Sequence, residues 1–170
     1  MKGNSNAIPG RRPIPDYREL KSMFNDPEII EEMLAQAKTI AVVGMSDKPQ
    51  RASFNIGQYL ATQGYRVYPV NPALTEILGA PCYPDLDAAQ AAAREQTEAG
   101  IDLVDVFRAS EHVPPIVDDV IRLGIKYLWL QDEVIHEEAV AKARAAGVKV
   151  VEDDCIYREH AKRAGKNPTE

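Results

Sequence analysis

The sequence is poor in cysteine, and the two that it has, Cys82 and Cys155, lie far apart in the chain. They form neither a CxxC pair, which is typical of zinc and redox sites, nor the dense pattern of a disulfide-rich secreted protein. The sequence therefore predicts no metal site of this kind. Both cysteines are interpreted as packed thiols.

Long apolar runs and an excess of positive charge are also absent. No run approaches the roughly 18 apolar residues that a membrane helix needs, and MKGNSNAIPGRRPIPDY has no apolar core that would serve as a secretory signal. The chain has 20 Lys and Arg against 26 Asp and Glu, a formal net charge of -6, which argues against an extended surface for nucleic acid or anionic membrane. We therefore expect a cytoplasmic protein that binds neither.

The motifs of common nucleotide sites and catalytic centres are missing. Neither the dinucleotide fingerprint GxGxxG nor the GK[ST] of a P-loop is present, and there is no GxSxG elbow or HExxH helix. The three histidines, His112, His136 and His160, each adjoin a glutamate and are interpreted as surface or capping residues. Asp102 and Asp105 have opposite facing on a predicted strand and form no carboxylate pair. With no complete reaction centre, the sequence favours a binding protein over an enzyme.

The sequence does contain the material of one globular domain. Its 170 residues, 45% of them hydrophobic, are enough to bury a core. Residues 1–16, with three prolines and two glycines, are predicted to form a flexible arm, residues 17–165 the domain and residues 166–170 a tail. Within the domain, Asp26 as N-cap and Pro27 at the first helical position predict a leading amphipathic helix.

From residue 39 onward, short apolar runs alternate with helical stretches. Gly64, Gly124 and Gly147 each end a predicted helix just before the next apolar run, which is typical of repeated βαβ units. The pattern predicts an α/β protein with a three-layer, Rossmann-like, doubly wound parallel sheet of about five strands. We expect strands at 39–43, 66–70, 102–106, 127–130 and 148–151, and helices at 53–63, 85–98, 110–123 and 134–146.

The loop after the first strand is the first candidate for a ligand site, because open parallel sheets bind ligands beyond the carboxyl ends of their strands. Gly44 allows a sharp exit from the strand, and Lys48 and Arg51 add positive charge beside a helix amino end. The alternative is a solvated connector with Ser53 as a plain N-cap. The second strand ends in YPVNP, without the acidic residue that binds the adenosine ribose of NAD. An adenine nucleotide bound without this ribose contact, or one with its own ribose phosphate, therefore fits better than NAD.

Five stretches, IAVVGMSDKPQRAS, GYRVYPVNP, VDVFRASEHVPPIV, LWLQ and VVEDDCI, together resemble the CoA-binding domain family. These are small Rossmann-like proteins similar to the N-terminal domain of the succinyl-CoA synthetase alpha subunit, and the similarity spans residues 27–163. The resemblance implies a CoA or acyl-CoA ligand, with adenine near the end of the second strand and pyrophosphate at the first loop. Carried over by position, the implied contacts are Gly44, Met45, Ser46, Lys48, Arg51 and Ser53 around the phosphates, Val70, Asn71 and Pro72 beside the adenosine, Val106, Phe107 and Arg108 after the third strand, and Gln131 at the next strand end.

The roles of some of these residues are left open. Phe107 would either flank the ligand or pack as a core aromatic, and Arg108 would either meet phosphate or form a surface ion pair. Met45 stands where the family often has a small residue, so that it would narrow the pocket or pack on the ligand. The stretch from Asp85 to Gly100 is longer than the usual link into the third strand, and it is interpreted as a surface helix or a long insertion and not as part of a site.

The resemblance implies a binding role without catalysis by this chain alone. In succinyl-CoA synthetase a histidine on a separate downstream domain carries the phosphate, and this chain ends at about the point where that domain would begin. We expect a CoA sensor or partner subunit, with a partner protein or a homo-oligomer left open. The alternatives are a small NAD(P)-dependent oxidoreductase and a protein-interaction module that has lost its ligand.

Overall fold

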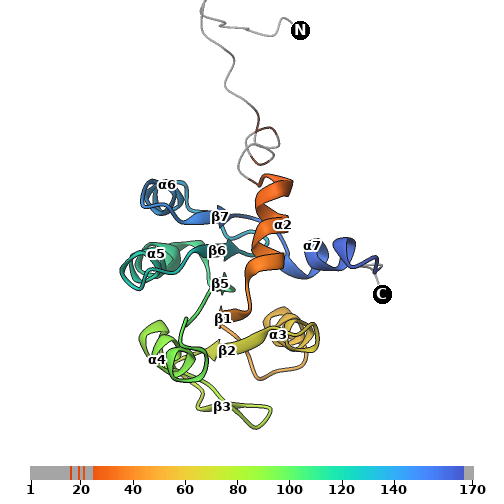
Figure 1. The fold of residues 1–170 in the computed structure, drawn as a ribbon, viewed down its shortest axis with the longest axis vertical. Helices are drawn as coiled ribbons and strands as arrows, with labels where there is room; N and C mark the ends of the chain where they lie inside the picture. Colours follow the sequence, from red (N-terminus) through yellow and green to blue (C-terminus); the bar gives the residue numbers. More distant parts are fainter. Residues whose placement is uncertain (1–15, 17–18, 20, 22–24, 167–170) are drawn as a thin grey trace, which may run out of the picture.

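The computed structural model describes residues 16, 19, 21 and 25–166, which are coloured in Figure 1. The predicted arm, residues 1–16, lies outside the described residues apart from Asp16. Of the predicted tail, only Lys166 is described.

Five parallel strands form the central sheet. Their order is β2-β1-β5-β6-β7, and every neighbouring pair is parallel. The central strands β1, β5 and β6 are buried along their whole length, which explains why their sequences are almost wholly apolar. The predicted sheet is confirmed. Its strands are β1 (Thr39–Val43), β2 (Arg66–Val70), β5 (Leu103–Val106), β6 (Tyr127–Leu130) and β7 (Lys149–Val151).

Helices cover both faces of the sheet and complete the three layers. In Figure 1, α4 (Leu86–Thr97), α5 (Val113–Arg122) and α6 (Glu137–Ala145) lie on one side, and α2 (Pro27–Gln36), α3 (Ala52–Thr62) and α7 (Ile156–Arg163) lie on the other. The buried apolar side chains accordingly form two clusters, one on each face. Alternate residues of β5 enter different clusters, since Val104 and Val106 face α4 to α6 whereas Leu103 faces the other layer.

Local signals start several of these helices. Asp26 caps α2 by accepting a hydrogen bond from the Glu28 N–H at 2.8 Å, with Pro27 in the first turn, as predicted. His136 caps α6, because its Nδ1 accepts from the Ala139 N–H at 3.1 Å. The predicted helix at 110–123 differs in its first turn, which is a 3-10 helix, η1 (Ser110–His112), that runs directly into α5.

Near its carboxyl end, the outer edge of β2 is blocked to pairing with a further strand. Pro69 has no N–H to offer a further strand, and its carbonyl accepts from the Tyr83 N–H at 2.9 Å. The Asn71 N–H in turn donates to the Tyr83 carbonyl at 2.9 Å. These bonds follow a short hairpin, β3 (Glu76–Ile77) and β4 (Ala80–Pro81), and bring the start of α4 beside the end of β2.

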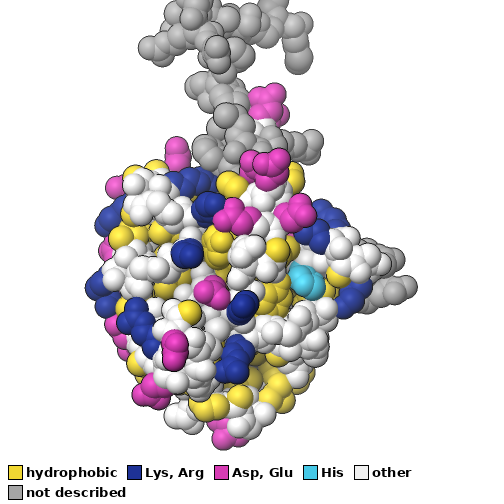
Figure 2. Space-filling model, in the orientation of Figure 1, with side chains coloured by type: hydrophobic (Ala, Val, Ile, Leu, Met, Phe, Trp, Pro, Cys, Tyr) yellow, Lys and Arg dark blue, Asp and Glu magenta, His cyan; other side chains and the backbone are white. Residues whose placement is uncertain are grey.

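The face seen in Figure 2 has no extended basic surface, and the described helices include none that could span a membrane. Figure 2 shows Lys and Arg interspersed with Asp and Glu over the visible face. Among the described residues, no helix combines the length and apolar character needed to cross a bilayer.

Asn25 joins the segment before α2 to the end of β7, and its loss should destabilise the fold. The Asn25 side chain, 8% exposed, donates to the Glu152 carbonyl at 2.7 Å and accepts from the Glu152 N–H at 3.0 Å. Asn25→Ala leaves both backbone groups without these partners, so we expect the free energy of unfolding to fall by about 2 kcal/mol in urea denaturation. Asn55→Ala, which removes two exposed amide bonds, serves as control and should cost about 0.5 kcal/mol. Equal losses in the two variants would contradict this account.

Candidate functional site

The strand order places a crevice between β1 and β5. After β1 the chain crosses to β2 on one side, and after β5 it continues to β6 on the other. The loops that follow β1 and β5 therefore leave the sheet in opposite directions, which is where doubly wound sheets bind ligands. Gly44 begins the first of these loops, and Phe107 and Arg108 begin the second.

Gly44 lies against the second loop at very short range. Its φ is +84°, and its N–H donates to the Val70 carbonyl at 2.8 Å. A Cβ at this position would lie 2.9 Å from the Phe107 carbonyl oxygen and 3.0 Å from the Arg108 Cδ. Only glycine combines this backbone conformation with so close an approach.

On one side of Gly44 lies a polar hollow of about 400 Å³, which we call the loop hollow. Two serines shape it, because the Ser53 Oγ accepts from the Ser46 N–H at 3.0 Å and the Ser46 Oγ accepts from the Lys48 N–H at 3.1 Å. Ser53 is therefore not the N-cap of α3, and that alternative is wrong: the cap position is Arg51. The loop hollow is lined by Gly44, Ser46, Lys48, Arg51, Ala52, Ser53 and Phe107.

The charge of the loop hollow favours an anion. Lys48 and Arg51 are exposed, and neither side chain makes an ion pair with another described residue. The hollow also faces the amino end of α3, whose first turn has no acidic residue. A helix amino end and two unpaired cations together suit a phosphate or diphosphate group.

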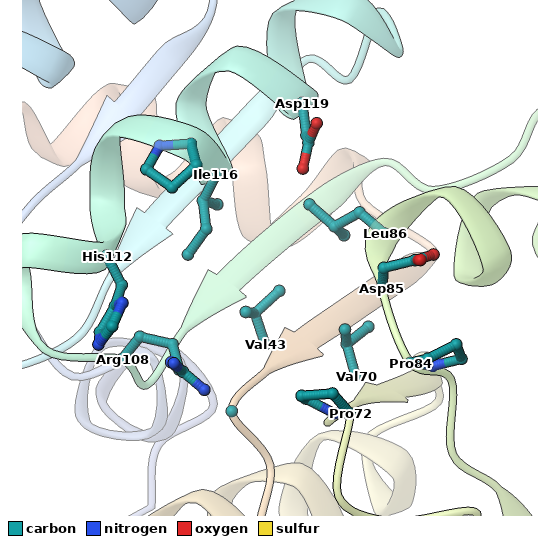
Figure 3. Close-up of a pocket in the computed structure, with 12 residues that line it drawn as sticks. Val43, Val70, Pro72, Pro84, Asp85, Leu86, Arg108, His112, Ile116 and Asp119 are labelled. Atoms are coloured by element: carbon teal, nitrogen blue, oxygen red, sulfur yellow. The ribbon is translucent and has the colours of Figure 1, made fainter.

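On the other side of Gly44 lies a mainly apolar hollow of about 200 Å³, which we call the apolar hollow. In Figure 3, Val43 and Val70 lie at the ends of their strands, Leu86 and Ile116 extend from α4 and α5, and Arg108 and His112 lie together at one side. Gly44 is the one described residue that lines both hollows, so they adjoin each other at this position. The apolar hollow is lined by Val43, Gly44, Val70, Pro72, Pro84, Asp85, Leu86, Arg108, His112, Pro115, Ile116 and Asp119.

The structure brings most of the sequence-predicted residues to these hollows. Phe107 is half-buried and lines the loop hollow, while Arg108, also half-buried, has no ion pair with any described residue, so the surface-pair alternative is wrong. Trp129 is fully buried and donates to the Asp154 carbonyl at 2.9 Å, as expected of a core residue. The predicted residues at the hollows are Gly44, Ser46, Lys48, Arg51, Ser53, Val70, Pro72, Phe107 and Arg108.

Four predicted residues line neither hollow. Met45 is 4% exposed and packs on Gly57, where a Cβ would lie 2.5 Å from the Met45 Cε, so its side chain points into the core. The Asn71 amide donates to the Met45 carbonyl at 3.0 Å. Val106 and Gln131 are buried in the sheet, the latter bonded to Asp105. Met45 thus neither narrows a hollow nor lies where a ligand in one would touch it.

Sequence reasoning missed the residues that distant elements contribute. Asp85 and Leu86 come from the start of α4, which had been interpreted as a surface stretch, and Ile116 and Asp119 come from α5. His112, interpreted as a surface or capping residue, is the N-cap residue of α5 with a side chain that is 45% exposed, and it also lines the apolar hollow. The only sign in the sequence that residues of α5 lie at the site is the stretch VPPIV, which directly follows His112.

The remaining candidates for reactivity are structural. Burial raises the pKa of both cysteine thiols, Cys82 and Cys155, which disfavours the thiolate. His160 Nδ1 lies 2.8 Å from the Tyr59 hydroxyl. Within the part of the chain that the structure describes, no group of three or more His, Cys, Asp or Glu residues is arranged to hold a metal ion.

Residues 38–161, which include both hollows, match the family model described as CoA binding domain. The chain belongs to the CoA-binding domain family.

Two relatives and one solved structure are similar to this CoA-binding domain. It is 34% identical over 132 residues to the uncharacterized protein YneT of Bacillus subtilis, covering 78% of the chain and 92% of that protein. It is 29% identical over 135 residues to the ADP-forming acetate–CoA ligase I of Archaeoglobus fulgidus, covering 74% of the chain but 18% of the ligase. A hypothetical protein from Pyrococcus horikoshii OT3 shares the fold with a TM-score of 0.71 and 38% identity, covering 80% of this chain and 90% of that one.

One carboxyl side chain of the CoA-binding domain, that of Asp105, is fully buried near the carboxyl ends of the strands. Asp105 of β5 has no exposed surface, its Oδ1 accepts from Gln131 Nε2 at 2.7 Å, and its Oδ2 has no hydrogen-bond partner among the described residues. Burial raises the pKa of Asp105 to about 7, although the Gln131 bond acts in the opposite direction. Asp105 therefore ionises in the folded protein only at considerable cost.

The burial of Asp105 predicts a pH-dependent stability. Because its folded pKa, about 7, lies above its ordinary value of 3.8, the folded state binds the proton more tightly. The free energy of unfolding should fall as the pH rises from about 4 to about 7, by up to about 4 kcal/mol from this group. Asp105→Asn should flatten that dependence and be more stable than the parent at pH 8, as measured by urea denaturation at pH 5 and pH 8. Glu31→Gln, at an exposed carboxylate, is the control; a parent whose stability is no lower at pH 8 would contradict the prediction.

Gly44→Ala should destabilise the domain by more than its backbone conformation alone explains. We expect the free energy of unfolding to fall by about 3 kcal/mol, since the methyl group would meet the Phe107 carbonyl in addition to the strain of a positive φ. Gly124→Ala is the matched control, because Gly124 has a φ of +69° but nothing within 4 Å of the added Cβ, and should cost about 1 kcal/mol. Similar losses in the two variants would mean that the close approach at Gly44 is not a constraint.

Proposed function

We propose that this domain binds CoA or an acyl-CoA across the carboxyl ends of β1, β2 and β5. The observation that carries the proposal is the pair of adjoining hollows, one cationic and one apolar, that both have Gly44 in their lining. The diphosphate of the ligand would occupy the loop hollow, and the adenine ring would occupy the apolar hollow. Membership of the CoA-binding domain family supports this choice, as does the similarity to a ligase whose name includes CoA.

The loop hollow supplies what a diphosphate requires. Lys48 and Arg51 are free to approach phosphate oxygens, because neither side chain is held by a carboxylate of the described chain. The hydroxyls of Ser46 and Ser53 accept backbone hydrogen bonds and so fix the shape of the loop. Phe107 lines the same hollow and would pack beside the start of the pantetheine arm.

The apolar hollow suits an adenine ring. Val43, Val70 and Pro72 bound it from the strands, and Leu86 and Ile116 bound it from the helices. No acidic side chain follows β2: Asn71 stands there, and its amide is engaged with Met45 and Ala73. The site therefore lacks the carboxylate that binds the adenosine ribose of NAD, which disfavours NAD as the ligand.

The role that best fits these features is that of a CoA sensor or partner subunit. The reason for suspecting a module without a ligand was Met45, and that side chain lies in the core, away from both hollows. The two hollows offer binding contacts, and nothing in their lining pairs a nucleophile with a base.

Calorimetric titration with CoA, acetyl-CoA, NAD and NADP tests the proposed function. CoA or acetyl-CoA should bind saturably, and Arg51→Gln should weaken binding roughly tenfold because a charge-assisted phosphate contact is lost. Lys126→Gln, which removes an exposed cation next to the amino end of β6, is the control and should leave the affinity unchanged. Saturable binding of NAD without binding of CoA or acetyl-CoA would overturn the proposal.

A further inference from the structure

The side chains of Arg108 and His112, which both carry N–H groups, lie together at one side of the apolar hollow. Arg108 follows β5, and His112 is the last residue of η1. Figure 3 shows the two side chains next to each other, with the Asp85 carboxylate on the opposite side. The Arg108 guanidinium has no ion pair or hydrogen bond with the described residues. The His112 side chain is 45% exposed, and its Nε2 lies 3.5 Å from the carboxylate of Glu111, which is itself exposed.

The Arg108 side chain is held near the point where the two hollows meet. Its Cδ lies 3.0 Å from the position that a Cβ would take on Gly44, so its aliphatic stem packs on the glycine. A longer residue at position 44 would displace that stem. Arg108 therefore lines the apolar hollow beside Gly44, the residue at which the two hollows adjoin.

The backbone offers an anion few donors on this side. The Val113 N–H already donates to the Ser110 carbonyl, and the next two residues of α5, Pro114 and Pro115, have no N–H. Any anion bound here must be held by side chains, and Arg108 and His112 are the two that line the hollow with N–H groups.

The carboxylates of the hollow are engaged elsewhere. The Asp85 side chain caps α4 through the Ala88 N–H at 2.8 Å, and Asp119 accepts from Arg122 at 2.9 Å. Neither carboxylate pairs with Arg108. The Arg108 guanidinium is therefore not neutralised by either carboxylate of the hollow and is available to an anionic group of a ligand.

We infer that Arg108 and His112 bind the phosphate on the ribose of the bound adenosine, so that the domain selects CoA over dephospho-CoA. The inference rests on the proposed function, because it takes the adenine to lie in the apolar hollow. The ribose then lies near Gly44, with its 5′ substituent directed to Lys48 and Arg51. Its 3′ phosphate is directed to the guanidinium, the group that best matches phosphate geometry.

Titration with CoA and with dephospho-CoA, which lacks only the ribose phosphate, tests the inference. The parent protein should bind CoA at least about tenfold more tightly than dephospho-CoA. Arg108→Gln should reduce that preference to about threefold or less while changing the affinity for dephospho-CoA less than about twofold. His112→Gln should reduce the preference in part, and Arg108→Lys, which keeps the charge, should retain more of it than Arg108→Gln.

Two comparisons separate this role from a general effect. Arg51→Gln should weaken both ligands equally and leave their ratio unchanged, because both carry the diphosphate. A thermal melt of each variant confirms that it is folded at the titration temperature, and Arg108→Met, which keeps an aliphatic stem without the guanidinium, repeats the test if Arg108→Gln is not.

The outcomes distinguish the inference from the function on which it rests. Equal affinity of the parent for CoA and dephospho-CoA would overturn the inference and leave CoA binding standing. Equal weakening of both ligands by Arg108→Gln would overturn it too, since the arginine would then contact a part that the two ligands share. Absence of binding to either ligand would overturn the proposed function and the inference together.

Discussion

The close contact between Gly44 and the start of the second loop is the constraint on which the site depends. The glycine N–H is bonded to Val70 of β2, while its α-carbon lies against the Phe107 carbonyl and the Arg108 stem of the loop after β5. One residue therefore fixes the relative positions of three strand ends. Because the same residue lines both hollows, the geometry that joins the strands also joins the two halves of the site.

A second contact decides which way the first loop faces. Gly57 of α3 has no side chain, and Met45 fills that space, which turns the methionine inward. The Met45 carbonyl then accepts from the Asn71 amide, so the loops after β1 and β2 are tied together. With these residues committed to the fold, residues 47–51 form the exposed part of the loop, and they include Lys48 and Arg51, whose charges are unpaired among the described residues. Packing, rather than residue type, thus decides which residues of the first loop face the core and which face the solvent.

The sequence predicted the sheet well because the relevant signals are local. Short apolar runs, the Asp26 cap and glycines after helices each act over a few residues, and the five strands follow from them. The site was predicted by position along the chain, which locates strand ends but does not determine the direction of a side chain. Gln131 shows the difference, since it does stand at a strand end, yet its amide is turned into the sheet toward Asp105.

Contributions from distant elements could not be predicted in the same way. The start of α4 reaches the site because Tyr83 bonds to Pro69 and Asn71 at the edge of β2, an arrangement with no periodic signal. The stretch that contains this helix resembled a surface insertion, because its alanines pack in the core without forming a strongly apolar face. Asp105 was likewise considered only as a member of a carboxylate pair, whereas its isolation and burial are properties of the assembled sheet.

The two sides of the sheet give the site its chemical asymmetry. The loop hollow lies at the amino end of α3, where backbone dipoles and cations favour negative charge, whereas the apolar hollow lies between α4 and α5. A ligand that used both would have to cross the edge of the sheet over Gly44, with an apolar ring and a charged group separated by a short linker. A simple anion would gain contacts only in the loop hollow, and a simple aromatic molecule only in the apolar hollow. Under the proposed function, a ligand that joins both parts in one molecule, as a nucleotide does, would gain contacts in both hollows for the entropic cost of a single association.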